Sequence, residues 1–381
     1  MTRSSFRAPF EIRPDPQLAE LASMLDPAAV AALAGPRLAP AALVDVRLRQ
    51  LDYRPRVRAT IRYELRLRSA GTATTLDAVA TVEPSGTELR LFPDDAGLGG
   101  LALLGDPAAL ARRLGVESGP VEVLAWVPGL RATVRMGASV LKFYDSSDHA
   151  AAAVDALRRV ETVVPTGALL GWDADAAIVA QRRVEGRPLE RADAVASAAE
   201  AARLVRTLHR WDAGDEPLAD GSPAALVAKL GGPVELIGFA RPDLGERLAA
   251  VRDRLHGTLP APARLVPSHG DYNLGQLLRG TDGSLHVVDL DTLCLADPAL
   301  DLASYASNVV SGREGDVEAA VALLDQLRLA YGDDTGALAW HFGAGVLRRV
   351  DRAIRRTKKR WGERTERLVA AAEATVERLE S

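Results

Sequence analysis

The sequence has little of several residue types that mark large classes of proteins. It contains one cysteine, Cys294, so no intramolecular disulfide can form and a reducing compartment is expected. It has no basic excess, and a formal net charge of -4 argues against a nucleic-acid-binding protein. Its first residues contain no apolar signal segment, and no apolar run approaches the length of a membrane span. We therefore expect a cytoplasmic protein without nucleic-acid or membrane partners.

Lysine is also scarce. Four lysines stand against 43 arginines, so arginine supplies almost every surface cation and a lysine inside a strand is unusual. Lys142 lies in residues 139–144, a β-rich segment with apolar neighbours on both sides. A compact ammonium group on a flexible stem suits a point contact with nucleotide phosphates. The alternative is a strand lysine whose ammonium group reaches solvent.

The chain is long enough, at 381 residues, for two or three domains with sizeable cores. Hydrophobic residues make up 48% and charged residues 26%, which is typical of globular proteins and excludes disordered and fibrous classes. The chemically informative side chains gather in one stretch, residues 268–301, which combines several aspartates with two carboxamides.

A β-hairpin is expected within this stretch. Two short apolar segments, residues 277–279 and 285–288, flank an Asp-Gly pair, which is a strong hairpin signal. Gln276 stands just before the first strand and Asp289 just after the second, so antiparallel pairing should bring them to roughly 5 Å. Asp271, on the preceding loop, would overlook the space between them. That arrangement suits a magnesium-bound nucleotide and an incoming hydroxyl group.

The loop around Asp271 resembles the kinase pattern H-R-D-x-x-x-x-N, with glycine in the second place and glutamine in the last; the matching residues are His269, Gly270, Asp271 and Gln276. A D-x-D sequence and then DPALDLA follow in order. Together these motifs resemble the aminoglycoside phosphotransferase and choline kinase superfamily. The HGD-x-x-L-G-Q loop is similar to its maltokinase and actinobacterial glucosamine kinase branch. The resemblance implies an α+β, bilobal protein-kinase-like fold with a small β-rich nucleotide lobe and a helical C-lobe.

The resemblance also implies a role for each of these side chains. The counterpart of Asp271 is the catalytic base, and the counterparts of Gln276 and Asp289 hold magnesium. Asp291 matches a second family carboxylate near the metal. The implied cofactors are therefore ATP and Mg²⁺.

Lys142 matches the strand lysine that contacts the phosphates of ATP in this fold. A glutamate on the following helix would orient that lysine. The helix expected at residues 148–163 offers only Asp155 and Glu161 as inward acidic candidates, and neither falls cleanly at the family position.

The remaining nucleotide contacts are also taken from the resemblance. The turn at Gly129 would lie over the nucleotide phosphates, since glycine permits close backbone approach. The backbone around Gln181 and Arg183, at the end of the strand expected at residues 176–183, would hydrogen-bond the adenine edge.

The sequence contains a short internal repeat. YRPRVRATIRY, residues 53–63, aligns with WVPGLRATVRM, residues 126–136, and proline, arginine, alanine, threonine and arginine recur at matching places. We interpret the two segments as related β-hairpins. The first is followed by a strand without lysine, residues 76–82, so we expect a copy without nucleotide chemistry. Chance similarity between arginine-rich hairpins is the alternative.

Three regions follow from these patterns. We expect residues 1–118 to form an additional N-terminal α+β cap region that carries the first hairpin. Residues 119–186 would form the nucleotide-binding N-lobe and end in a Gly-Pro hinge. Residues 187–381 would form the helical C-lobe with the catalytic and metal-binding loops.

A basic segment, residues 345–361, is predicted to be one helix and could attract an anionic partner. Acidic residues outnumber basic ones in the chain as a whole, 51 to 47. We therefore favour a solvated helix face that is partly paired with acidic neighbours.

The sequence thus predicts an ATP-dependent phosphotransferase that phosphorylates a hydroxyl of a sugar, amino sugar or aminoglycoside-like acceptor. The alternative is a catalytically weak or inactive kinase-like regulator that binds nucleotides. This alternative would be favoured by glutamine at position 276 and by the lack of an identified acidic partner for Lys142. An aminoglycoside is a polycation and would need an acidic wall, which the sequence does not locate.

Overall fold

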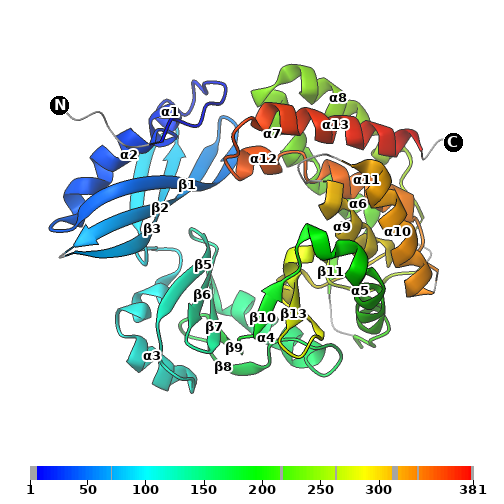
Figure 1. Ribbon diagram of the computed structural model, residues 1–381, viewed down its shortest axis with the longest axis horizontal. Coiled ribbons are helices and arrows are strands. Elements are labelled where there is room, and N and C mark those ends of the chain that lie inside the picture. The colour runs from blue at the N-terminus through cyan, green and yellow to red at the C-terminus, as the bar shows by residue number, and fades with distance from the viewer. Residues whose placement is uncertain are drawn as a thin grey trace.

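The computed structural model describes residues 7–69, 71–214, 218–261, 264–310, 316–332 and 334–378. Strands dominate the first half of the chain and helices the second, which is the predicted α+β class (Figure 1). The chain runs from an N-terminal sheet through a second sheet into a helical region, and its last helices return beside the first sheet (Figure 1).

The N-terminal region is a four-stranded antiparallel sheet in the order β1-β2-β3-β4, preceded by short helices. Alternation along β2 buries Ala59, Ile61, Tyr63 and Leu65 on one face. The hydroxyl of Tyr63 donates to Met24 O at 2.7 Å and ties the sheet to α1. The elements are α1 (Leu21–Met24), α2 (Pro27–Ala34), η1 (Gly35–Leu38), β1 (Ala42–Arg54), β2 (Arg58–Ser69), β3 (Thr72–Glu83) and β4 (Gly86–Leu91).

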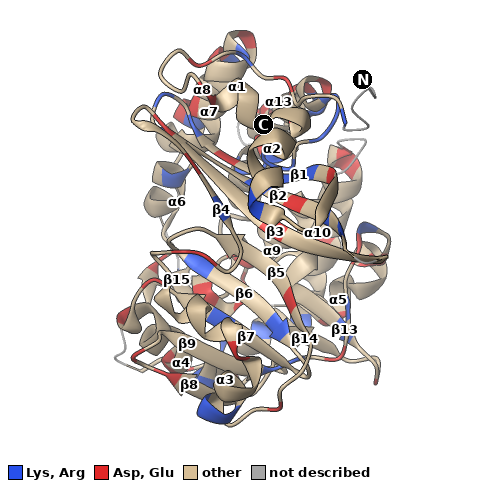
Figure 2. Cartoon of the chain, turned by 90° about the vertical axis from the view of Figure 1, so that its left-hand side faces the viewer, with Lys and Arg blue, Asp and Glu red and all other residues tan. Residues whose placement is uncertain are grey.

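The second region is a five-stranded antiparallel sheet in the order β5-β6-β7-β9-β8. Acidic and basic residues are interspersed over both sheets when they are viewed from their side (Figure 2). The elements are η2 (Gly99–Gly105), α3 (Pro107–Leu114), β5 (Val121–Val127), β6 (Arg131–Met136), β7 (Ser139–Tyr144), α4 (Ser147–Val160), β8 (Leu169–Asp173) and β9 (Ile178–Arg182).

The two repeated segments form hairpins with the same pairing register. Tyr53 pairs with Ala59 across the first, and Trp126 pairs with Ala132 across the second. In each turn a residue with positive φ follows the proline, Arg56 at 65° and Gly129 at 69°.

An aspartate braces each of these turns in the same way. Asp15 accepts hydrogen bonds from Tyr53 Oη and from the N–H of Arg56, both at 2.7 Å. Asp95 accepts from Trp126 Nε1 at 2.8 Å and from a turn N–H at 2.9 Å. Because the aromatic partner and the turn contact recur together, the interpretation as related hairpins is favoured over chance similarity.

The helical region contains two small three-stranded sheets, ordered β10-β13-β14 and β11-β15-β12. Helices α5, α9, α10 and α11 supply much of its core. Its helices are α5 (Ala194–His209), α6 (Pro223–Lys229), α7 (Gly231–Ala240), α8 (Pro242–Gly257), α9 (Ala299–Val310), α10 (Val317–Tyr331), α11 (Leu338–Leu347), α12 (Arg352–Arg355) and α13 (Trp361–Glu377). Its strands and 3₁₀ turns are β10 (Gly186–Pro188), η3 (Arg191–Asp193), β11 (Ala219–Asp220), β12 (Val266–Ser268), η4 (Leu274–Gln276), β13 (Leu277–Gly280), β14 (Leu285–Val287), η5 (Leu290–Thr292) and β15 (Cys294–Ala296).

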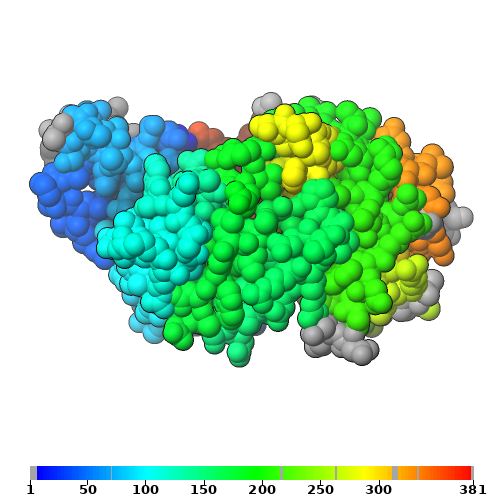
Figure 3. All heavy atoms as spheres, turned by 90° about the horizontal axis from the view of Figure 1, so that it is seen from below, coloured from blue at the N-terminus to red at the C-terminus, as the bar shows by residue number. Residues whose placement is uncertain are grey.

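The N-terminal sheet docks on the last helices. Strand β1 lies against α7 and α12, and Thr357 Oγ1 donates to Leu48 O at 3.2 Å. The rings of Tyr53 and Phe239 meet edge to face with centroids 6.0 Å apart. Trp361 Nε1 donates to a backbone carbonyl near the N-terminus at 3.0 Å. From below, the second sheet separates the blue N-terminal region from most of the helical region (Figure 3).

The basic segment at residues 345–361 is not the single helix that its sequence predicts. Helix α11 ends at Leu347, α12 spans four residues, and α13 begins only at Trp361. Thr357 and Arg360 adopt left-handed conformations, with φ of 45° and 58°, which interrupt a helix.

One segment contradicts the expectation that the chain has no long apolar run. Helices α6 and α7 together form an 18-residue segment, Pro223–Ala240, with a mean hydropathy of 1.2, long and apolar enough by composition to cross a membrane. The sequence does not read as one apolar run because Lys229, Pro233 and Glu235 interrupt it. In the structure Leu226, Leu230 and Ile237 of this segment lie in the core, which is the other role of such a helix.

Candidate active site

The loop that carries Asp271 requires glycine immediately before it. Gly270 adopts a φ of 79°, and a β-carbon there would lie 2.3 Å from the carbonyl oxygen of Thr292. Thr292 in turn donates its hydroxyl to His269 O at 2.8 Å. The close approach of these two segments therefore places Asp271 beside the β13–β14 hairpin.

Asp301 anchors this loop by accepting hydrogen bonds from its backbone. Its carboxylate is fully buried and accepts from the N–H groups of His269 at 2.7 Å and Gly270 at 3.0 Å, and from His209 Nε2 at 3.1 Å. Burial by itself would raise the pKa of Asp301, but the hydrogen bond and charge of His209 and the contacts of His269 hold that pKa below its ordinary value. Asp301 thus acts on the loop backbone.

The predicted hairpin is present and its open end carries the expected side chains. Strands β13 and β14 pair antiparallel, and the N–H of Val288 donates to Gln276 O at 2.9 Å. Gln276 Nε2 donates to Asp289 Oδ2 at 3.2 Å. Asp289 adopts a left-handed backbone conformation with φ 63° and ψ 59°, an uncommon one for a residue with a side chain. That conformation turns the chain directly after β14.

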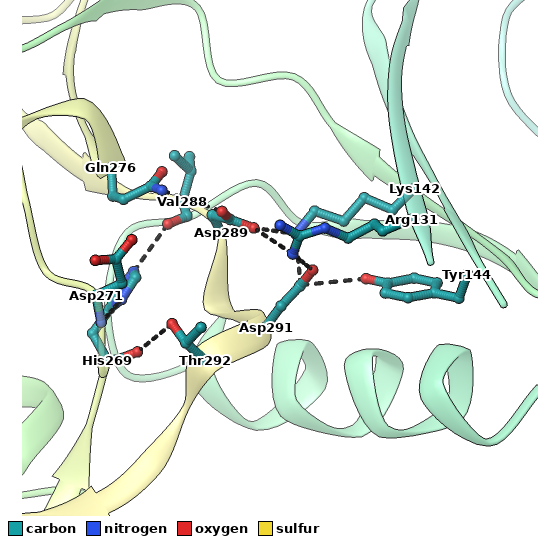
Figure 4. A network of polar contacts seen from close by, with 10 residues as sticks. All are labelled: Arg131, Lys142, Tyr144, His269, Asp271, Gln276, Val288, Asp289, Asp291 and Thr292. Atoms are coloured by element: carbon teal, nitrogen blue, oxygen red, sulfur yellow. Dashed lines mark hydrogen bonds and ion pairs between the residues drawn. The ribbon is translucent and has the colours of Figure 1, made fainter. Parts of the chain in front are cut away.

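Lys142 finds its acidic partners on this hairpin and not on α4. Its Nζ lies 2.9 Å from Asp289 Oδ1 and 2.6 Å from Asp291 Oδ1 (Figure 4). The candidate Glu161 instead accepts from the N–H of Leu169 at 3.0 Å. This agrees with the poor match of Asp155 and Glu161 to the family position, since the two hairpin carboxylates pair with the lysine.

Two further side chains join the network, and sequence reasoning did not single them out. Arg131 NH1 lies 2.6 Å from Asp291 Oδ2, and Tyr144 Oη donates to Asp291 Oδ1 at 3.3 Å (Figure 4). The register of the sheet explains their convergence, because Arg131 pairs with Tyr144 across β6 and β7. Burial would raise the pKa of Asp289, but Lys142 and Arg131 hold it below its ordinary value.

The carboxylates fit a magnesium site. Within the part of the chain that the structure describes, no group of three or more histidine, cysteine or acidic side chains converges to hold a metal alone. The donors here are Asp289, Asp291 and the amide of Gln276, and the two carboxylates already balance the charges of Lys142 and Arg131. Mg²⁺ commonly takes one or two carboxylates and completes its shell with water and phosphate oxygens, so this set can hold it.

Three other predicted nucleotide contacts, Gly129, Gln181 and Arg183, lie in or beside the second sheet, and they stay predictions. The N–H of Gly129 donates to Asp95. Gln181 is paired with neighbouring strands on both sides of β9, and the N–H of Arg183 donates to Ala138 O at 2.9 Å. The N–H of Arg183 is therefore already paired within the chain.

A cavity of about 730 Å³ lies beside the loop that carries Asp271. Asp271 and Gln276 line it together with a group of basic residues from α12 and its flanks. Arg348 NH2 lies 3.5 Å from Asp271 Oδ1 and Arg348 NH1 donates to Gly270 O at 3.3 Å. The interpretation of the basic segment as a solvated, partly paired face holds in part. Arg355, Arg356 and Lys358 are exposed and Arg348 pairs with Asp271, but Arg349 is buried in the cavity wall.

Residues 130–341 match the model of a family described as the phosphotransferase enzyme family. A comparison with curated proteins found no match. The chain is similar in structure to a choline/ethanolamine kinase family protein from Mesorhizobium loti, with 17% identity and a TM-score of 0.50 over 72% of this chain and 92% of that one. It is also similar to the choline kinase LicA from Streptococcus pneumoniae, with 14% identity and a TM-score of 0.51 over 70% and 96%.

An aminoglycoside phosphotransferase from Streptomyces rimosus, solved in complex with ADP and streptomycin, has 21% identity and a TM-score of 0.49 over 65% of this chain and 98% of that one. At such identities the similarity to the two choline kinase structures shows the fold, which is the predicted protein-kinase-like one.

Proposed function

The chain belongs to the phosphotransferase enzyme family, as an ATP-dependent enzyme acting on a small-molecule hydroxyl, and we propose that its acceptor is a sugar or related polyol oriented by Asp271. What supports this proposal is that Asp271 lines the 730 Å³ cavity together with Gln276. The amide of Gln276 donates to Asp289, which pairs with Lys142, so the cavity adjoins the network of Lys142, Asp289 and Asp291. The similarity of the HGD-x-x-L-G-Q loop to sugar kinases supports a sugar acceptor.

Each side chain has a distinct task in this reaction. Asp271 accepts a hydrogen bond from the acceptor hydroxyl and orients its oxygen, and Arg348 holds the Asp271 carboxylate from the cavity side. Lys142 and Arg131 balance the charge of the hairpin carboxylates and can turn to nucleotide phosphates.

Asp289, Asp291 and Gln276 would hold Mg²⁺, which when bound neutralises charge on the phosphates. Positioning and charge neutralisation supply most of the acceleration in phosphoryl transfer, because its transition state is loose. A strongly basic aspartate is therefore not required.

We also propose a separate role for each of three regions of the chain. Residues 1–118 would form a cap, residues 119–186 the nucleotide-binding lobe and residues 187–381 the catalytic lobe. The sheets support this division: Thr133 faces Lys142 across the second hairpin sheet, whereas Thr60 faces Thr81 at the corresponding place in the first. The first copy thus lacks the nucleotide lysine. A cytoplasmic location, where ATP is abundant, would suit the reaction.

The proposal is tested by acceptor-dependent formation of ADP from MgATP across neutral, acidic and amino sugars. We expect turnover with at least one sugar class and its loss without magnesium. Thermal stabilisation by MgATP without turnover on any acceptor would instead support a regulator that only binds the nucleotide.

A further inference from the structure

The turn of the second hairpin is held by a carboxylate from outside its sheet. Asp95 lies in the loop between β4 and η2, and only 6% of its surface is exposed. Its Oδ2 accepts from Trp126 Nε1 at 2.8 Å and from the N–H of Gly129 at 2.9 Å. Its Oδ1 accepts from the N–H of Gly97 at 3.0 Å. One buried carboxylate therefore ties its own loop to the hairpin turn.

This loop and the turn also meet at close range. A β-carbon on Gly97 would lie 2.5 Å from Gly129 Cα, so the approach requires glycine at position 97. The ring of Phe92, at the start of the same loop, meets Trp126 edge to face with centroids 5.3 Å apart. Because buried hydrogen bonds and close packing act together here, the chain itself holds the turn in one position.

The N–H groups at the centre of this turn are engaged within the chain. The N–H of Gly129 donates to Asp95. The N–H of Leu130 donates to Val127 O at 3.1 Å, and the proline between Val127 and Gly129 has no N–H. The side chain that follows the turn is that of Arg131, the first residue of β6. We therefore place the contribution of this turn to the site in the Arg131 guanidinium.

Arg131 carries the position of the turn into the site. Its NH1 lies 2.6 Å from Asp291 Oδ2 and 3.6 Å from Asp289 Oδ1 (Figure 4). Its backbone pairs with Val127 on one side and with Tyr144 on the other. Because Arg131 closes the turn directly, a shift of the turn would move the guanidinium relative to the two carboxylates that fit Mg²⁺.

We propose that Asp95 is a positioning residue of the nucleotide site, which fixes the turn between β5 and β6 and thereby holds Arg131 against Asp291 and Asp289. This inference rests on the nucleotide site of the proposed function and not on its acceptor. Asp95 acts on the site through the turn. It also lies within residues 1–118, so the proposed cap region contributes to the nucleotide site.

The first hairpin provides a matched comparison inside the same chain. Asp15, with 5% of its surface exposed, accepts from Tyr53 Oη and from the N–H of Arg56, both at 2.7 Å. This turn meets Phe239 of α7, since the Arg56 guanidinium carbon lies 5.8 Å from the centroid of that ring. The two aspartates are therefore alike in burial and hydrogen bonding, but Asp15 supports a contact with α7 and not the carboxylate network.

The test compares Asp95→Asn with Asp15→Asn. Binding of a non-hydrolysable ATP analogue with Mg²⁺ is measured by calorimetry, and thermal unfolding is followed in parallel. We expect similar losses of stability in the two variants. The affinity for the analogue should fall about 10-fold in Asp95→Asn and stay within about twofold of the wild type in Asp15→Asn. Equal affinities for the analogue in the two variants would overturn the inference.

A milder pair of variants keeps the test decisive if Asp95→Asn does not fold. Trp126→Phe removes the indole N–H that donates to Asp95 but keeps an aromatic ring beside Phe92. Tyr53→Phe removes the matching hydroxyl of the first hairpin. We expect Trp126→Phe to bind the analogue about threefold more weakly or worse and Tyr53→Phe to match the wild type. Wild-type affinity in Trp126→Phe contradicts the positioning role.

A double-mutant cycle separates positioning from a general loosening of the lobe. Arg131→Gln alone should weaken binding of the analogue with Mg²⁺ about 10-fold. Adding Asp95→Asn to it should cost less than about twofold more, because the turn acts through Arg131. Losses that multiply independently would show that Asp95 acts on the lobe as a whole, and the inference would then be wrong.

The inference and the proposed function fail in different ways. If the wild type binds the analogue but phosphorylates no sugar, the proposed acceptor is wrong, while the comparison of Asp95→Asn with Asp15→Asn still decides the inference. If the wild type does not bind the analogue, both are wrong. If sugars are phosphorylated and Asp95→Asn binds the analogue as tightly as Asp15→Asn does, the proposed function stands and the positioning role is wrong.

Discussion

Lys142 Nζ lies 2.6 Å from Asp291 Oδ1, an ion pair that joins the second sheet to the hairpin of the helical region. Both residues are largely withdrawn from solvent, with side-chain exposures of 5% and 14%. The pair brings the proposed nucleotide lysine and the proposed metal carboxylates into one network. It also explains how the lysine is oriented without a carboxylate from α4.

Lys142→Ala should weaken the use of ATP strongly, raising the KM for ATP about 10-fold or more, because a buried charge contact with the phosphates is lost. The matched control is Arg62→Ala on β2, in the copy without the lysine, whose guanidinium pairs with Asp77 at 2.7 Å. The KM for ATP of this control should stay within about twofold of the wild type. A larger loss in Arg62→Ala would mean that the first hairpin sheet binds the nucleotide.

Asp289→Asn should lower turnover by about 10²-fold or more and weaken magnesium-dependent binding of ATP, since the principal charged metal ligand is removed. Asparagine tolerates the left-handed backbone at this position, so the turn should survive. Asp282→Asn, exposed at the tip of the same hairpin, is the control. Unchanged MgATP affinity by titration would show that Asp289 does not hold the metal.

Asp301→Asn should destabilise the protein by about 2–4 kcal/mol at neutral pH, because a buried carboxylate that accepts two loop N–H groups and pairs with His209 is neutralised. The pKa of Asp301 is lowered in the folded state, so its stabilisation is present above the ordinary value of 3.8 and is lost as pH falls through the folded value. Urea unfolding at pH 7 and under acid conditions measures both effects. Exposed Asp253→Asn is the control, and equal stabilities of the two variants at pH 7 would contradict the role of Asp301.

Asp351→Asn should have a pH-dependent effect of the opposite sign. Desolvation raises the folded pKa of Asp351 to about 6, against the opposing charges of Arg355 and Arg348 and with a contribution from Asp52. The folded state therefore binds the extra proton between about pH 4 and 6, and stability from this group is lost as pH rises through that range. The asparagine variant should gain in free energy of unfolding relative to the wild type from pH 4.5 to pH 7.5. A difference that is constant across this range would refute the expectation.

The catalytic hairpin could be predicted because its signals are local. An Asp-Gly turn between short apolar segments determined the pairing, and that pairing places Gln276 beside Asp289. Glycine at position 270 has an equally local reason, since its positive φ and its contact with Thr292 exclude a β-carbon.

The cation network and the cavity could not be predicted in the same way, because they depend on contacts between distant segments. Arg131 reaches Asp291 across 160 positions of sequence, and nothing in its neighbours distinguishes it from the other arginines of the chain. The sequence predicts one helix over the basic segment because nothing in its residue pattern indicates the breaks at Thr357 and Arg360. Asp15 and Asp95 stand 38 and 31 positions before the aromatic residues that they contact, so their spacing gave no common signal and only the structure shows which turn each one braces.

The most direct test of the central claim follows the γ-phosphate itself. ATP labelled at that position is incubated with magnesium and a mixture of neutral and anionic sugars, and label in organic acceptors is measured for the wild type and for Asp271→Asn. The wild type should transfer label, and the variant should do so about 10²-fold more slowly with unchanged folding and MgATP affinity, because only the orientation of the hydroxyl is lost. Equal rates in the two proteins, or MgATP binding without transfer to any acceptor, would contradict the assignment of Asp271 and of phosphoryl transfer to this site.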